Sequence, residues 1–193
     1  MQEQTPGSSR LPTSSQTIVL TGFMGAGKTT VGRLLAARLG WNFLDLDAEI
    51  EREAGITISE IFRIHGEPDF RAREASTLQS RITRAETVLA LGGGAIESEA
   101  IRALLAATPG VCTVFLSAPL QALIDRCLAQ QQKSSAIRPV LADRERLHAR
   151  WANRLPHYQQ AHLRFETQNL TPEQVASNIA ESVTHLLRTG MKP

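Results

Sequence analysis

Cysteine is scarce in this chain, whose 193 residues include only Cys112 and Cys127. The two are not spaced as Cys-x-x-Cys, and no histidines accompany them at the spacing of zinc ligands. The sequence therefore gives no reason to expect a structural zinc site. Free cysteine is usually found in protein interiors, so we expect both residues to be ordinary buried or half-buried thiols.

Long apolar runs and a strong charge imbalance are also missing. No apolar run approaches the roughly 20 residues that cross a bilayer, and the N-terminal residues show no apolar signal core. We therefore expect a soluble cytoplasmic protein that does not bind membranes. Lys and Arg number 21 against 19 Asp and Glu, which gives no reason to expect a nucleic-acid partner. Nothing in the pattern demands a protein partner, and we expect a monomer that binds small molecules.

Apolar anchors are absent from two segments. Residues 1–15, MQEQTPGSSRLPTSS, are polar and rich in Ser, Gln and Pro. Such a segment cannot bury enough surface to offset the entropy lost on ordering, so we expect a flexible tail there. The run AQQQKSSA at residues 129–136 is similarly poor in apolar residues. We interpret it as part of a lid that covers about residues 127–142.

Between these segments, short β-branched or apolar runs alternate with longer amphipathic stretches. This alternation is typical of βαβ units and of a mostly parallel sheet, so we predict an α/β fold. The length suits one domain with one core, which we place at residues 16–190. The expected strands are residues 17–21, 42–46, 87–91, 111–116 and 163–167. The expected helices are residues 28–39, 97–107, 119–130, 144–160 and 172–187, with several short ones from 47 to 84.

A glycine-rich stretch directly follows the first expected strand. Residues 22–29, GFMGAGKT, fit the phosphate-binding P-loop pattern G-x-x-x-x-G-K-[ST], with a strand before and a helix after as the motif requires. Its glycines let successive N–H groups converge on phosphate oxygens, and the helix N-terminus adds a partial positive charge. Lys28 would reach the β- and γ-phosphates, and the Thr29 hydroxyl would bind Mg²⁺. The predicted nucleotide-binding residues are Gly25, Ala26, Gly27, Lys28, Thr29 and Thr30.

Two aspartates, Asp45 and Asp47, end the second expected strand in the sequence LDLD. Residues two apart on a strand point to the same side, and the carboxyl ends of parallel strands face the ligand crevice. We therefore expect both carboxylates beside the P-loop. One could hold Mg²⁺, directly or through water, and the other could accept the proton of an attacking hydroxyl. The alternative is that one of them caps the following helix.

Three arginines could bind anions in the same crevice. Arg71 and Glu74 are three residues apart and share a helix face, so the carboxylate can hold the guanidinium in place. Arg138 lies at the base of the expected lid and could swing onto a transferring phosphate, while Arg154 could grip a carboxylate with two hydrogen bonds. The alternative for each is a solvated surface arginine.

A run of three glycines, Gly92, Gly93 and Gly94, follows the third expected strand. Glycine at a strand end permits close approach of a bulky group to the backbone, and the run offers several N–H donors. A plain flexible loop is the alternative.

Together these pieces resemble the shikimate kinase family, P-loop enzymes that phosphorylate the 3-hydroxyl of shikimate with ATP. The resemblance covers about residues 17–187 and rests on an ordered set of motifs, GFMGAGKTTVGR, LDLD, FRAREA, LGGGAI, RPVL and RLPHY. It implies a three-layer P-loop fold with a five-stranded parallel sheet, like that of nucleoside monophosphate kinases. It also implies a small helical substrate-binding segment at about residues 47–84, MgATP and shikimate as ligands, and a role in aromatic amino acid biosynthesis.

The resemblance implies roles for the residues that act on phosphate. Asp45 is similar to the family's aspartate of the magnesium shell, with Thr29 as the other protein ligand. Asp47 is similar to the aspartate that hydrogen-bonds the reacting hydroxyls and is a candidate base. Arg138 resembles the lid arginine that reaches the phosphates during transfer, and Lys28 is the P-loop lysine. Lys28, Asp47 and Arg138 are thus the expected catalytic residues.

The resemblance also implies the contacts of the two ligands. Arg71 and Arg154 match the arginines that hold the shikimate carboxylate, with Glu74 orienting Arg71, and the three glycines match the run beside shikimate. The expected substrate-binding residues are Asp47, Arg71, Gly92, Gly93, Gly94 and Arg154. Arg126 and Pro172 fall where the family sandwiches adenine. Phe62 and Phe70 resemble the aromatic wall of the substrate pocket, with core packing as the alternative.

Two rival functions stay open. One is a kinase for another small hydroxy acid such as gluconate, or for a nucleoside monophosphate. The paired arginines and the glycine run argue against this rival. The other is a nucleotide-sensing module that has lost catalysis, against which the intact set of charged residues argues, because a sensor has no need of a substrate clamp.

Overall fold

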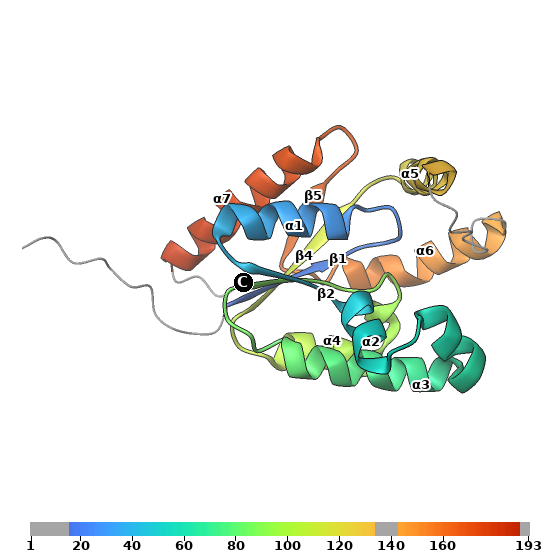
Figure 1. Ribbon diagram of the computed structural model, residues 1–193. Coiled ribbons are helices and arrows are strands. Elements are labelled where there is room, and N and C mark those ends of the chain that lie inside the picture. Colours follow the sequence, from blue (N-terminus) through green and yellow to red (C-terminus); the bar gives the residue numbers. More distant parts are fainter. Residues whose placement is uncertain (1–15, 134–142, 190–193) are drawn as a thin grey trace, which may run out of the picture.

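The computed structural model describes residues 16–133 and 143–189 of the chain. Within them, a five-stranded parallel sheet has the strand order β2-β3-β1-β4-β5 and is covered by helices on both faces (Figure 1). The expected α/β architecture of three layers is thereby confirmed. The expected tail at residues 1–15 lies outside the described residues. So does the part of the expected lid from residue 134 to 142, which includes Arg138.

All five expected strands are present, with ends that differ by a residue at most. They are β1 (Thr17–Thr21), β2 (Asn42–Asp45), β3 (Thr87–Ala90), β4 (Val111–Ser117) and β5 (Leu163–Glu166). Every residue of β1 and β3 is buried. These strands lie inside the sheet between helical layers, which is why they are continuous apolar or β-branched runs instead of alternating ones.

The helices also follow the expected order. They are α1 (Lys28–Leu39), α2 (Leu46–Ala54), α3 (Ile58–Arg81), the 3-10 turn η1 (Ala95–Glu97), α4 (Glu99–Ala107), α5 (Leu120–Lys133), α6 (Arg144–Tyr158) and α7 (Pro172–Thr189). Gly40 ends α1 in the left-handed conformation, φ 70°, as expected for a glycine after a helix. Thr171 caps α7 by accepting a hydrogen bond from the N–H of Gln174. The helix expected at residues 97–107 begins two residues later, at Glu99, because Ser98 caps it directly after η1.

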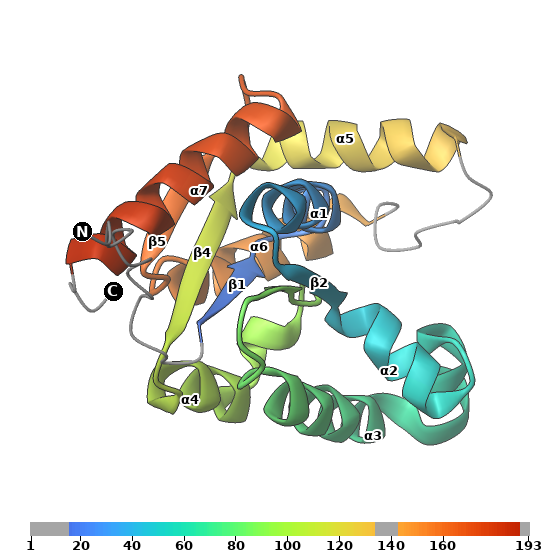
Figure 2. The same cartoon turned by 60° about the vertical axis from the view of Figure 1, so that its left-hand side comes forward.

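The segment expected to hold several short helices contains only α2 and α3. Gly66 interrupts α3 with φ 79° and ψ 174°, so α3 is two helical pieces that meet at a kink. Pro68 is tolerated because it begins the second piece, where its missing N–H has no partner to lose. Helices α2 and α3 lie side by side at the β2 side of the sheet (Figures 1 and 2), and they carry Asp47, Arg71 and Glu74.

The P-loop is packed tightly against α5 at one glycine. A Cβ atom at Gly25 would stand 2.5 Å from the carbonyl oxygen of Leu123 and 2.9 Å from Sγ of Cys127. Since φ of Gly25 is also 75°, no other residue fits there without moving α5.

Cys127 is fully buried and Cys112 half-buried, as expected for ordinary thiols. Among the described residues, no helix combines the length and the apolar character that crossing a bilayer requires.

Candidate active site

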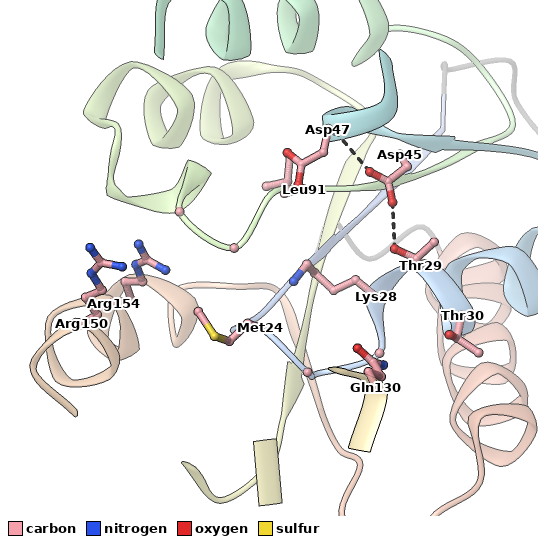
Figure 3. Close-up of a pocket in the computed structure, with 14 residues that line it drawn as sticks. Met24, Lys28, Thr29, Thr30, Asp45, Asp47, Leu91, Gln130, Arg150 and Arg154 are labelled. Carbon is pink, nitrogen blue, oxygen red and sulfur yellow. Dashed lines mark hydrogen bonds between the residues drawn. The ribbon is translucent and has the colours of Figure 1, made fainter. Parts of the chain in front are cut away.

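A cavity of about 520 Å³ opens between the P-loop, the ends of β2 and β3, and α6 (Figure 3). It brings together the P-loop, both aspartates, two residues of the glycine run and one of the three predicted arginines. Its lining residues are Met24, Gly25, Gly27, Lys28, Thr29, Thr30, Asp45, Asp47, Leu91, Gly93, Gly94, Gln130, Arg150 and Arg154.

Lys28 begins α1 and turns back over the P-loop. Its Nζ donates hydrogen bonds to the carbonyl oxygens of Gly22, at 2.8 Å, and Phe23, at 3.2 Å. Burial lowers the pKa of Lys28 to about 8, although the nearby carboxylates of Asp47 and Asp45 act in the opposite direction. The ammonium group therefore holds the loop in shape and faces the cavity at neutral pH.

Thr29 and Asp45 are in direct contact. The Thr29 hydroxyl donates to Oδ2 of Asp45 at 2.7 Å, and the other carboxylate oxygen accepts the N–H of Asp47 at 3.2 Å (Figure 3). Asp45 is thus the N-cap of α2, which answers the question of which aspartate caps that helix. Because the helix starts at Leu46, Asp47 lies in its first turn and not on the strand. Both carboxylates line the cavity because one is the N-cap of α2 and the other lies in its first turn. They do not lie on one face of a strand, as was expected.

The Thr29 and Asp45 pair fits a magnesium ion as part of a larger ligand set. A hydroxyl and a carboxylate are hard oxygen ligands, and protein-bound Mg²⁺ usually keeps several waters and takes the rest of its oxygens from one or two carboxylates and substrate phosphates. Among residues 16–133 and 143–189, no group of three or more His, Cys, Asp or Glu is arranged to hold a metal. A metal at this place would therefore depend on oxygens from a bound nucleotide.

Asp47 is held close to the glycine run. A Cβ atom at Gly92 would stand 2.6 Å from Oδ1 of Asp47 and 3.2 Å from Oε1 of Glu74, so a side chain at this position would displace a carboxylate. Burial raises the pKa of Asp47, and the neighbouring Asp45 raises it further, while Lys28 acts against them. A raised pKa makes the carboxylate a stronger base, which suits the role predicted for Asp47.

Arg71 and Arg154 converge on Gly94, although they come from α3 and α6. A Cβ atom there would stand 3.0 Å from Nη2 of Arg71 and 3.2 Å from Nη2 of Arg154. Nη1 of Arg71 donates to Oε2 of Glu74 at 2.7 Å, and the Glu74 side chain is 1% exposed. Arg71 also pairs with the exposed Glu67, at 3.1 Å. The predicted arrangement of two neighbouring guanidinium groups, one of them oriented by Glu74, is present.

A second cavity of about 330 Å³ adjoins the P-loop on the side of α5 and α7. Arg126 and Pro172 both line it, together with Gly27 and Thr30 of the P-loop region. The guanidinium of Arg126 is fixed by two hydrogen bonds to Thr167, at 2.9 Å to its hydroxyl and 2.6 Å to its carbonyl oxygen. A flat cationic group thus lies next to the predicted phosphate site, where it could stack on an adenine ring. The contact of Arg126 and Pro172 with adenine stays a prediction.

Three residues near the site were not singled out from the sequence. Arg150 lies one helical turn before Arg154 and lines the same cavity beside it (Figure 3). Tyr158, fully buried, donates from its hydroxyl to the carbonyl oxygen of Gly93 at 2.6 Å and so fixes the glycine run. Glu97 accepts a hydrogen bond from Arg154. Arg150 and Tyr158 are each four residues from Arg154 in the sequence, so a helix would place all three on one face. No such spacing in the sequence links Glu97 to Arg154.

The two phenylalanines of the expected aromatic wall differ in exposure. Their ring centroids lie 4.8 Å apart. Phe70 is 5% exposed and belongs to the hydrophobic core, in agreement with the core-packing alternative. Phe62 is 39% exposed, and its contact with substrate stays a prediction.

Comparisons with known proteins identify the family of the chain. The family model for shikimate kinase matches residues 24–184. The shikimate kinase of Geobacter metallireducens is 40% identical over 171 residues, which are 87% of this chain and 92% of the relative. That of Thermobifida fusca is 45% identical over 168 residues, 86% of this chain and 93% of the relative.

Solved structures give the same result. The shikimate kinase from Acinetobacter baumannii, solved in complex with shikimate, is 36% identical with a TM-score of 0.78, over 93% of this chain and 97% of the other. A gluconokinase from Sinorhizobium meliloti has a TM-score of 0.62 at 18% identity, over 91% of this chain and 95% of the other, and so shares the fold alone. By family model, sequence identity and fold, this chain belongs to the shikimate kinase family.

Proposed function

We propose that the chain transfers the γ-phosphoryl group of ATP to the 3-hydroxyl of shikimate, giving shikimate 3-phosphate and ADP, a step of aromatic amino acid biosynthesis. Membership of the family supports this proposal. The single structural observation behind it is the convergence of Arg71 and Arg154 at Gly94, in the neighbourhood of the P-loop. A compact carboxylate is the ligand that two adjacent guanidinium groups suit best.

In this mechanism the nucleotide phosphates lie on the N–H groups from Gly25 to Thr30, and the adenine lies between Arg126 and Pro172. Thr29 and Asp45 would hold Mg²⁺, which when bound neutralises phosphate charge. Lys28 contributes a positive charge at the same place. These contacts matter because phosphoryl transfer needs mainly positioning and charge neutralisation, with little covalent help from the protein.

The acceptor is held from the opposite side. Arg71 and Arg154 bind the shikimate carboxylate, the glycine run lies beside the ring, and Asp47 accepts a hydrogen bond from the 3-hydroxyl. As the hydroxyl oxygen bonds to the γ-phosphorus, the bond to the bridging oxygen of ADP breaks and the hydroxyl proton passes to Asp47. Burial, which raises the pKa of Asp47, makes it a better proton acceptor than an exposed carboxylate.

Arg138 completes the proposal, although it lies outside the described residues. We assign it to the transferring phosphoryl group, because the sequence places it in the lid segment. Closure of that segment would exclude water and suppress hydrolysis of ATP. The cytoplasmic location and the monomeric state stay predictions, and sedimentation velocity of the purified chain tests the second.

The proposed function is tested by ADP release. Purified protein with MgATP is assayed by a coupled enzyme system with shikimate, with gluconate and with neither, beside a Lys28→Ala control. We expect ADP release that depends on shikimate and is lost in the control. Turnover with gluconate alone would support the rival kinase, and nucleotide binding without turnover on any hydroxy acid would support the sensing module.

A further inference from the structure

Glu97 forms an ion pair with one of the two converging arginines. Its Oε2 accepts a hydrogen bond from Nη2 of Arg154 at 2.8 Å. The Arg154 side chain is 10% exposed and that of Glu97 is 39% exposed, so the pair extends from the buried site to its solvent edge. Glu97 has none of the roles assigned above.

The backbone around Glu97 is fixed. The residue ends η1, directly after the glycine run, and its N–H donates to the carbonyl oxygen of Gly94 at 3.0 Å. Nη1 of Arg102 donates to the carbonyl oxygens of Ile96 and Glu97, at 2.8 Å each. The carboxylate of Glu97 therefore projects from a short segment that is tied to the glycine run at one end and to α4 at the other.

Each of the converging arginines thus has its own carboxylate. Glu74 holds Arg71 from within α3, and Glu97 holds Arg154 across two elements distant in sequence. A guanidinium has five N–H donors in a rigid planar fork, so one hydrogen bond to Glu97 restrains its orientation and leaves other donors for a ligand. Packing supports the same orientation, because the guanidinium carbon of Arg154 lies 5.6 Å from the centre of the Phe23 ring.

We propose that Glu97 is a positioning residue for substrate binding, which holds the guanidinium of Arg154 in the orientation that accepts the carboxylate of the acceptor substrate. This inference rests on the proposed function, since it takes that carboxylate to be the ligand of Arg154. Without Glu97, Arg154 has to be ordered when the substrate binds, and the entropy lost in that ordering weakens binding.

Glu97 also has an effect of opposite sign, because it places a negative charge near the carboxylate of the substrate. Its side chain is 39% exposed, so water and salt screen this repulsion. The orientation of Arg154 depends on a direct hydrogen bond and is not screened in the same way. Positioning therefore outweighs repulsion, and the two effects are separable by substitution, since glutamine removes the charge but keeps an acceptor.

The experiment compares wild type with Glu97→Gln, Glu97→Ala and Glu99→Ala. Glu99 is a matched control because it is exposed, carries the same charge and lies two residues away. KM for shikimate and for ATP and kcat come from ADP release, and Kd for shikimate comes from calorimetric titration. Thermal midpoints report the fold.

We expect Glu97→Ala to raise KM and Kd for shikimate by about three- to tenfold, the range of a partly exposed charged hydrogen bond. Its kcat, KM for ATP and thermal midpoint should stay near those of wild type. Glu97→Gln and Glu99→Ala should remain within about twofold of wild type in all parameters. Partial rescue by glutamine is the outcome that a merely structural role would not produce.

Other outcomes overturn the inference. Unchanged or lower KM and Kd for shikimate in Glu97→Ala would mean that Arg154 needs no support, or that repulsion dominates. An equal loss in kcat, ATP binding and thermal midpoint would mean a general structural role. If the wild-type protein phosphorylates shikimate, either of these results overturns only the role of Glu97 and leaves the proposed function standing. Wild-type protein that neither binds nor phosphorylates shikimate would overturn the proposed function together with the role of Glu97.

Discussion

The guanidinium groups of Arg71 and Arg154 lie against the same backbone position, Gly94, where an added Cβ atom would stand 3.0 Å from one and 3.2 Å from the other. They come from α3 and α6, on either side of the glycine run. The absence of a side chain at Gly94 is therefore what allows the two cations to share one ligand.

Removal of either guanidinium should cost most of the substrate affinity. We expect Arg71→Ala and Arg154→Ala each to lose roughly 2–5 kcal/mol of shikimate binding, the scale for removing one partner of a desolvated charge pair. Kd for shikimate by calorimetry measures this loss, with Kd for MgATP as the internal control. An unchanged shikimate affinity in either variant would refute the assignment of the carboxylate.

A methyl group at Gly94 should also weaken shikimate binding without removing any charge. In Gly94→Ala, the new Cβ meets two guanidinium groups that are held by Glu74 and Glu97 and cannot move freely. We expect KM for shikimate to rise by about tenfold, with a smaller rise for Gly93→Ala, where the nearest atom is 3.6 Å from the added Cβ. Equal effects of the two substitutions would argue against crowding of the arginines as the cause.

The first parts of this site follow from local sequence signals. A P-loop needs a strand, a glycine-rich turn and a helix in direct succession, and all three lie within Thr17–Leu39. Parallel strands that are buried on both faces must be apolar, so β1 and β3 were also predictable.

Contacts between distant segments could not be predicted in the same way. Asp47 was expected at the end of a strand. Nothing in the sequence LDLD shows that the Asp45 side chain caps α2 and also accepts a hydrogen bond from Thr29. Glu97 is an exposed carboxylate in a short turn, and its importance depends on where α6 places Arg154. The family resemblance supplied the pairing of Arg71 with Arg154, which neither residue's neighbours in sequence indicate.

The lowered pKa of Lys28 has a consequence for nucleotide binding. In the free protein this pKa is about 8, since burial favours the neutral amine. Bound phosphate would favour the ammonium form and raise the pKa. Between about pH 8 and 9, binding of ATP should therefore take up protons. Calorimetric titration in buffers of different ionisation enthalpy measures this uptake, which should disappear in Lys28→Ala at saturating nucleotide. Binding enthalpies that do not depend on the buffer would contradict the prediction.

A histidine away from the site should make stability depend on pH. Nδ1 of His162 accepts the N–H of Thr113 at 3.0 Å, which ties the start of β5 to β4 and requires an unprotonated nitrogen. His162 is exposed as a residue, but partial shielding of its ring from water lowers its pKa from the ordinary 6.5. As the pH falls below about 6.5, the unfolded chain therefore takes up this proton first, so the stabilisation is complete above that pH and declines below it.

Urea unfolding at pH 7.5 and at pH 5.5 measures this dependence. The free energy of unfolding should fall less between the two pH values in His162→Gln than in wild type, because glutamine keeps an acceptor that does not titrate. His148→Gln is the matched control, since His148 is exposed on α6. A decline in His162→Gln equal to that of wild type would assign the pH dependence to other groups.

Arg150 should act on the arrival of the substrate more than on its final binding. It is exposed, lines the cavity one turn before Arg154, and forms no ion pair with any residue in the described part of the chain. An unpaired exposed cation at the mouth of a site attracts an anionic ligand over a distance that salt shortens. Arg150→Ala should therefore lower kcat/KM for shikimate by about two- to fivefold at low ionic strength, with little change in kcat.

The dependence on salt separates this role from a direct contact. Raising the ionic strength from about 0.02 to 0.3 M shortens the screening length several-fold, so the difference between Arg150→Ala and wild type should nearly vanish. Arg146→Ala is the matched control, because Arg146 lies on the same helix, carries the same charge and is already paired with Asp143 at 3.2 Å. A deficit in Arg150→Ala that persists at high salt would show instead that Arg150 touches the bound substrate. An equal loss of kcat/KM in Arg146→Ala would show that the overall charge of α6, and not the position of Arg150, causes the effect.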